Sequence, residues 1–212
     1  MLTTLNGAHD DGNWKAAYLP AIAKTTGPLD GLRGRHVLVL ADIENLYCSV
    51  REWELSLQFD QLAKLLQRQF KSVELHAFFS CRAGDQGQAA RCREAGWTPH
   101  PNEIQTVRRR GKLVRRANSD NVMLFWSGYL TGRESIDVVV IGSGDGDLGC
   151  DLAREIVRRD AAKSVVTLSV AGCTAERLNA EHNPFIDANL EVGLDCVEKL
   201  TTGRQRGWFP RP

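Results

Sequence analysis

Short apolar runs alternate with amphipathic segments from residue 36 onwards. Runs rich in β-branched residues predict strands at 36–42, 72–79, 136–142 and 164–172. Apolar residues at helical spacing predict helices at 59–70, 87–96, 119–130 and 147–160. The strands are apolar almost throughout, which is typical of a parallel sheet covered by helices on both faces. The pattern therefore predicts an α/β fold, in which ligands bind beyond the carboxyl ends of the strands.

The two ends of the chain do not follow this pattern. The first residues are polar, with one short helix expected at 13–24 and a Gly- and Pro-containing loop after it. The segment 174–200 is expected to be mostly helical. We therefore expect an N-terminal extension (1–34), one domain (35–200) and a C-terminal tail (201–212).

The composition is that of a globular protein with a substantial core, because 42% of the 212 residues are hydrophobic and 25% are charged. Since 27 Lys and Arg residues nearly balance 26 Asp and Glu residues, any nucleic-acid-binding surface must be a local basic patch. The sequence contains no apolar run long enough to span a membrane and no signal-peptide core in residues 1–30. It therefore predicts a cytoplasmic protein without a membrane span.

Acidic residues follow two of the predicted strands and open one of the predicted helices. Asp42, Glu44 and Asn45 come at the end of the first strand. Asp120 opens the helix at 119–130, and Asp145 and Asp147 follow the strand at 136–142. Carboxyl ends of parallel strands share one edge, so these groups can meet there. Two carboxylates ~4 Å apart repel by about 4 kcal/mol at an effective dielectric near 20, so a cluster requires a cation. Oxygen ligands of this kind favour Mg²⁺ or Mn²⁺, although such aspartates also serve as helix caps and turn formers.

The glycine-rich turn after the strand at 136–142 has two further interpretations. Its segment "GDGDLG" fits the dinucleotide-binding pattern, but the next strand ends without the acid that would hold a ribose. Asp145 and Asp147 would also repel a pyrophosphate. A calcium loop is excluded because Cys150 and Ile156 occupy the positions that require glycine and glutamate.

A basic stretch, "VRRRGKLVRR", lies just before Asp120 and predicts a hairpin with its tip at Gly111 and Lys112. Clusters of this kind bind phosphate backbones with little sequence preference, whereas most charge runs are simply solvated loops. Its adjacency to the acidic residues favours RNA binding. The expected RNA-binding residues are Arg108, Arg109, Arg110, Lys112, Arg115 and Arg116.

Four segments in order resemble the NYN domain family of PIN-like, LabA-type nucleases. They cover about residues 36–190 and read "VLVLADIENLY", "RRANSDNVMLFWSGYL", "VVVIGSGDGDLGCDLAREI" and "VAGCTAERLNAEHNPFID". The resemblance implies a three-layer α/β/α sandwich with a mostly parallel central sheet. It also implies a Mg²⁺- or Mn²⁺-dependent ribonuclease that leaves a 5′-phosphate on single-stranded or structured RNA.

The family's site residues map onto five positions of this chain. The resemblance implies that the catalytic residues are Asp42, Asn45, Asp120, Asp145 and Asp147, and that the four aspartates among them bind the metal. Two positions depart from the family pattern. Trp126 stands where the middle helix often carries an acid, and Asn183 stands where an aspartate is usual. The site therefore holds either one metal ion or two.

Other functions stay open. A catalytically silent RNA-binding regulator fits the same residues, and a homo-oligomer is compatible with them. A Mg²⁺-dependent phosphatase of the haloacid dehalogenase type is less favoured, because Glu44 replaces the second aspartate of its motif and no lysine occurs in 113–144. Tyr47, Trp53 and Trp97 are candidates both for base stacking and for the core, and His76 is expected in the core.

Overall fold

The structure is a computed structural model that describes residues 34–51, 54–109, 112–117, 119–170 and 172–199. The helix predicted at 13–24, the N-terminal extension and the C-terminal tail lie outside the described residues, as does Trp53. The helices are α2 (Ile43–Arg51), α3 (Phe59–Gln69), α4 (Gly87–Glu94), α5 (Ser119–Leu130) and α6 (Gly146–Arg159), with 3₁₀ turns η2 (Glu176–Leu178) and η3 (Leu194–Cys196). The strands are β1 (His36–Asp42), β2 (Leu55–Leu57), β3 (Ser72–Cys81), β4 (Thr98–Glu103), β5 (Gln105–Arg109), β6 (Lys112–Arg116), β7 (Val138–Gly142), β8 (Ser164–Ser169), β9 (Ala188–Glu191) and β10 (Val197–Lys199).

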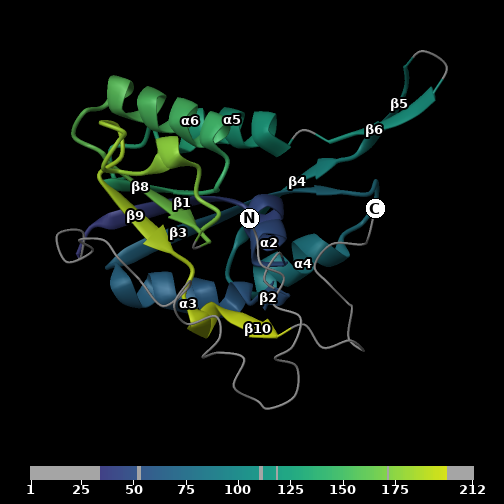
Figure 1. The fold of residues 1–212 in the computed structure, drawn as a ribbon, viewed down its shortest axis with the longest axis horizontal. Helices are drawn as coiled ribbons and strands as arrows, with labels where there is room; N and C mark the ends of the chain where they lie inside the picture. Colours follow the sequence, from purple (N-terminus) through teal and green to yellow (C-terminus); the bar gives the residue numbers. More distant parts are fainter. Residues whose placement is uncertain (1–33, 52–53, 110–111, 118, 171, 200–212) are drawn as a thin grey trace.

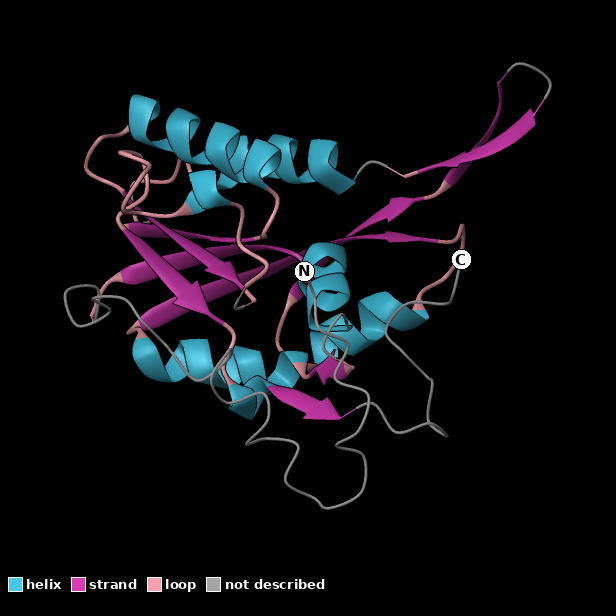
Figure 2. Cartoon of the chain, viewed as in Figure 1, coloured by secondary structure: helices cyan, strands magenta, loops and turns pink. Residues whose placement is uncertain are grey.

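The architecture is an α/β/α sandwich around a parallel sheet. Six strands follow the order β4-β3-β1-β7-β8-β9, and every neighbouring pair among them is parallel. Figures 1 and 2 show α5 and α6 on one face of this sheet and α2, α3 and α4 on the other. The predicted α/β three-layer sandwich is therefore confirmed.

Alternation along β1 explains why both faces of the sheet are covered. Val37, Val39 and Ala41 belong to the core on the α2–α3 side, whereas Leu38 and Leu40 belong to the core under α5 and α6. All five are 1% exposed or less. A strand in this position must be apolar at consecutive residues, which is the pattern that predicted it.

The structure differs from the sequence prediction at three places. Residues 98–103, for which the sequence pattern predicted no helix or strand, form the edge strand β4, in which only His100 is buried. Helix α2 begins directly after β1, where only a strand end was expected. The segment 174–200 was expected to be mostly helical, and this is wrong: it forms two 3₁₀ turns and the strands β9 and β10. The spacing of apolar residues in this segment had suggested a helix, but they form β9 instead. Strand β9 pairs with the open edge of β8 and becomes the sixth parallel strand.

The basic stretch forms the predicted hairpin. Strands β5 and β6 pair antiparallel, with Arg109 opposite Lys112, and the connecting residues 110–111 lie outside the described part of the chain. Figure 1 shows this hairpin reaching away from the sandwich beside the start of α5. Among the described helices, none has the length and apolar character needed to cross a membrane.

Candidate active site

Asp42 is the last residue of β1 and lies on the sheet face that α5 and α6 cover. It has the same parity along the strand as Leu38 and Leu40, which belong to that core. Its side chain is nearly enclosed, with the residue only 7% exposed. A carboxyl group that is this buried needs compensation, because desolvation penalises its charged form.

Two helices begin beside this strand end. Helix α6 follows β7, the direct neighbour of β1, and its N-cap is Asp145, whose Oδ1 accepts a hydrogen bond from the Asp147 amide at 2.8 Å. Helix α5 begins at Ser119, packs on β1 and carries Asp120 in its first turn. Helix N-termini stabilise negative charge, so both helices favour ionised aspartates here.

The acidic side chains influence one another electrostatically. Burial raises the pKa of Asp42 to about 7, and repulsion from Asp120 and Glu44 adds to this effect. Burial also raises the pKa of Asp120, with a further contribution from the charge of Asp145. Charge interactions therefore link Asp42 to Asp120 and Asp120 to Asp145, although these residues are far apart in the sequence.

Glu44 is a member of this cluster that the sequence prediction did not include among the site residues. Its Oε2 accepts hydrogen bonds from Ser80 Oγ at 2.9 Å and from Ser119 Oγ at 3.4 Å. Burial raises the pKa of Glu44, and these hydroxyl groups oppose that shift. The signal in the sequence was its position two residues after Asp42, but its partners come from β3 and α5.

Asn45 connects the strand end to the glycine-rich turn. Its backbone amide donates to Asp42 Oδ1 at 3.1 Å, as in a helix cap. Its side-chain Oδ1 accepts the amide hydrogen of Gly144 at 2.7 Å. Asn45 therefore fixes the distance between Asp42 and the turn that carries Asp145.

The glycines of the turn provide room for another part of the chain. The Gly144 carbonyl accepts a hydrogen bond from the Ala175 amide at 3.2 Å, and a Cβ at Gly144 would collide with the carbonyl oxygen of Cys173. A Cβ at Gly146 would collide with the side chain of Arg177. The small residues are thus required by the packing of the loop after β8 against the turn.

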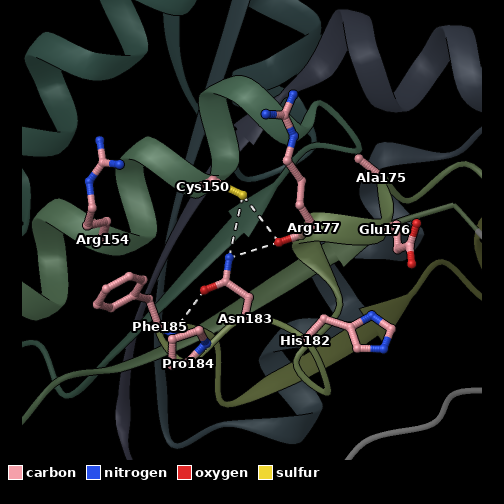
Figure 3. Close-up of a pocket in the computed structure, with 9 residues that line it drawn as sticks. All are labelled: Cys150, Arg154, Ala175, Glu176, Arg177, His182, Asn183, Pro184 and Phe185. Carbon is pink, nitrogen blue, oxygen red and sulfur yellow. Dashed lines mark hydrogen bonds between the residues drawn. The ribbon is translucent and has the colours of Figure 1, made fainter.

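Asp147 differs from the other predicted ligands. It forms an ion pair with Arg177, and its side chain is 81% exposed. Figure 3 shows Arg177 at the rim of a cavity of about 680 Å³ that contains none of the predicted site residues. In this conformation Asp147 is paired with an arginine that lines that cavity.

The residue that departs from the family pattern in the last segment, Asn183, has a structural role. Its Nδ2 donates to the Arg177 carbonyl at 2.8 Å and to Cys150 Sγ at 3.4 Å, and its Oδ1 accepts the Phe185 amide hydrogen at 3.0 Å (Figure 3). An amide can donate and accept in this way, whereas an ionised aspartate can only accept. Asn183 therefore secures the segment that carries Arg177.

Trp126, the other departure, packs beside the cluster rather than at the end of β1. Its ring lies against His100 on edge strand β4, with 4.7 Å between the ring centroids. Asp42, Phe78 and His100 are in register across β1, β3 and β4. The His100 backbone is therefore about 10 Å from the Asp42 backbone, given a strand spacing of about 4.8 Å.

The residues present fit a Mg²⁺ ion in charge and ligand type. In the described part of the chain no three His, Cys, Asp or Glu side chains are close enough together to hold a metal ion. Direct binding by all four aspartates is therefore not a feature of this conformation. Mg²⁺ commonly takes one or two carboxylates and keeps several waters, and a cation would stabilise the ionised form of the buried Asp42.

The predicted RNA-binding residues lie in the β5–β6 hairpin, where Arg108 and Lys112 are exposed. Arg109, Arg115 and Arg116 belong to the two strands, and Arg110 lies outside the described residues. Of the aromatic residues considered for base stacking, Tyr47 and Trp97 are each 2% exposed and belong to the interior. For these two residues the core interpretation is confirmed.

Comparison with known proteins supports the fold alone. No protein-family model and no curated protein matches the chain. A protein of unknown function from Vibrio parahaemolyticus has a similar structure, with a TM-score of 0.61 and 19% identity over 78% of this chain and 98% of that chain. MurG from Acinetobacter baumannii gives a TM-score of 0.39 and 15% identity over 73% of this chain and 40% of that chain, a similarity too weak to carry an argument.

The pKa of Asp42 predicts an effect of pH on the metal-free protein. Between the ordinary value of 3.8 and about 7, the folded chain keeps a proton on Asp42 that the unfolded chain has released. The free energy of unfolding should therefore fall as the pH rises through this window, by up to about 4 kcal/mol from this group. Asp42→Asn should remove that contribution, as measured by urea denaturation in a chelator at several pH values. Asp151→Asn, on the exposed face of α6, is the control, and parallel curves for wild type and Asp42→Asn would contradict the expected burial.

The packing of the glycine-rich turn predicts a second stability effect. Gly144→Ala forces a methyl group against the Cys173 carbonyl, so we expect a loss of about 1–3 kcal/mol in the free energy of unfolding. Gly193→Ala is a matched control, because a Cβ there meets nothing within 4 Å. The denaturant midpoint measures both changes. Equal midpoints for the two variants would show that the loop does not pack on the turn.

Proposed function

We propose that the protein is a metal-dependent ribonuclease of the NYN, PIN-like type, located in the cytoplasm, that hydrolyses RNA phosphodiester bonds at the end of β1. The observation that carries the proposal is the buried carboxyl group of Asp42, whose pKa is raised to about 7 beside Asp120 and Glu44. A structural cap does not require three acidic side chains in one place. A divalent cation would compensate their charges, and Mg²⁺ commonly takes only one or two carboxylates directly.

The metal in this proposal is Mg²⁺ or Mn²⁺, held by Asp42 and Asp120 directly or through water, with Asp145 adding negative charge. When bound, the cation lowers the pKa of a water molecule so that hydroxide is available near neutral pH. Asp145 also caps α6, and Asn45 keeps the turn at its distance from Asp42. Asp147 is paired with Arg177, so its part in this proposal is to position that guanidinium.

The hairpin supports RNA as the substrate. Its exposed cations, Arg108 and Lys112, precede α5 directly, and α5 carries Asp120 at its start. Phosphate groups bound along β5 and β6 would be held close to the carboxylates that the metal neutralises. Cation contacts of this kind bind any sequence and release counterions.

The central test is cleavage of a labelled single-stranded RNA in Mn²⁺. Asp42→Asn and Asp145→Asn keep the shape of each side chain but remove its charge, so each should lower the cleavage rate at least 100-fold. We base this magnitude on the loss of metal affinity or activity caused by disturbing a metal site. Asp151→Asn should cleave like the wild type, because Asp151 pairs with Arg154 on the exposed side of α6.

The outcome also separates the alternative functions. RNA binding without any Mn²⁺-dependent product identifies the catalytically silent regulator, which the pairing of Asp147 with Arg177 favours. Hydrolysis of a chromogenic phosphomonoester without RNA cleavage identifies the phosphatase. Equal RNA cleavage by the wild type and both asparagine variants would remove the proposed site.

The role of the hairpin predicts a change in salt dependence. For single-stranded RNA the slope of log affinity against log salt changes by about 0.7 for each phosphate contact. Arg108→Ala with Lys112→Ala should therefore reduce the slope by about 1.4, measured by fluorescence anisotropy in a chelator. Arg68→Ala with Lys71→Ala is the matched control, since these exposed cations lie at the end of α3 and the start of β3. An unchanged slope in the hairpin variant would exclude phosphate contacts by these two side chains.

A further inference from the structure

The outer face of α5 exposes large apolar side chains, whereas most other aromatic rings among the described residues are covered. Phe125 is 73% exposed, Tyr129 is 69% exposed and Leu124 is 41% exposed. Phe125 and Tyr129 are four residues apart and therefore lie on the same side of the helix. The only charged residue of α5 is Asp120. Exposed aromatic residues grouped in this way are typical of an interaction surface.

The two exposed rings are supported from the core. Trp126 makes edge contacts with both, at centroid distances of 6.0 Å to Phe125 and 5.9 Å to Tyr129. Trp126 in turn rests on His100, which stacks on Phe78 in the sheet at 4.6 Å. A chain of ring contacts thus leads from the buried strand β3 to the surface. Because these rings are already held in place, they lose little conformational entropy when a flat partner binds.

Cations lie at both ends of this face. The β5–β6 hairpin joins the start of α5 and exposes Arg108 and Lys112 (Figure 1). The exposed Arg159 of α6 lies beside Gly128, where a Cβ would be 3.5 Å from its Nη1. The charges around the rings therefore complement a chain of phosphates. Aromatic faces flanked by arginine are a common arrangement for unpaired bases.

The rings also lie close to the candidate active site. With a rise of 1.5 Å per residue, Phe125 is about 7.5 Å and Tyr129 about 13.5 Å along the helix from Asp120. At about 100° per residue the two rings are turned about 140° and 180° around the helix from Asp120, so they lie on a different face. A strand bound to the rings would therefore reach the acidic cluster by passing around the N-terminal end of α5, where the hairpin joins. A duplex keeps its base faces stacked on one another and cannot offer them to these rings.

We infer that Phe125 and Tyr129 form a stacking surface for unpaired bases, so that the RNA bound at the site is single-stranded. The inference rests on the proposed function for its ligand and extends it to the substrate class. The Trp126–His100 contacts orient the rings, and Arg159 with the hairpin cations holds the phosphates on either side. The sequence prediction had named other aromatic residues for this role, because exposure cannot be read from residue type.

The test measures binding separately from cleavage. Fluorescence anisotropy in a chelator gives the affinity for a single-stranded oligonucleotide that contains 2-aminopurine and for a duplex of equal length. Phe125→Ala and Tyr129→Ala should each weaken single-strand binding about 5- to 100-fold and abolish quenching of the 2-aminopurine, which reports stacking. Duplex binding should change less than twofold. Tyr129→Phe is the matched control that keeps the ring, and it should bind like the wild type.

Each outcome has a distinct meaning. Unchanged single-strand affinity in both alanine variants, with RNA still cleaved, overturns the stacking surface and leaves the proposed nuclease intact. Loss of stacking without any Mn²⁺-dependent product supports the stacking surface and removes the nuclease. If the wild type binds no RNA, both proposals fail. A sedimentation change from dimer to monomer in Phe125→Ala, with unchanged RNA affinity, assigns this face to a second copy of the chain and also overturns the inference.

Discussion

The carboxyl group of Asp42, enclosed at the end of the central strand, is the constraint on which the candidate site depends. Burial and the neighbouring acids raise its pKa to about 7, so its charged form is costly in the metal-free protein. The start of α2 partly offsets this cost, because the backbone amides of Asn45 and Glu44 donate hydrogen bonds to the carboxyl group. A divalent cation would supply the remaining compensation. The same burial that is unfavourable for the protein alone makes a bound cation effective.

The geometry of the site is maintained by contacts between distant segments. Asn45 holds the turn after β7 by a hydrogen bond to Gly144, across 99 positions of sequence. The loop after β8 packs on that turn, and it brings Arg177 to Asp147. The glycines that resemble a phosphate-binding loop are thus required by packing between protein segments. Their arrangement therefore holds the turn beside the end of β1.

The hairpin and α5 form the second surface to which we assign a function in this proposal. One contributes exposed cations and the other contributes exposed rings supported by Trp126. Phosphates and bases are the two chemically different parts of a nucleic acid strand, and these two elements match them separately. Because Phe125, Tyr129 and Asp120 all belong to α5, this helix would connect the bases stacked on the rings to the acidic cluster at its first turn. Substrate choice and catalysis would in this way share one helix.

The positions of aspartates at strand ends and helix starts indicated the candidate carboxylates, because strand ends share an edge. Hydrophobic periodicity by itself determined four of the six strands of the parallel sheet and the helices α3 to α6, because buried strands must be apolar, but it missed α2 and β4. It could not identify β9 and β10, since a short apolar run takes the conformation that its neighbours can pair with. The sequence pattern also could not show that Glu44 belongs to the site or that Asp147 forms an ion pair with Arg177. Those roles depend on Ser80, Ser119 and a loop about 30 residues beyond α6's start. Only the tertiary structure decides which charge lies within reach of another, because electrostatic and ring contacts depend on distance in space and on exclusion of water.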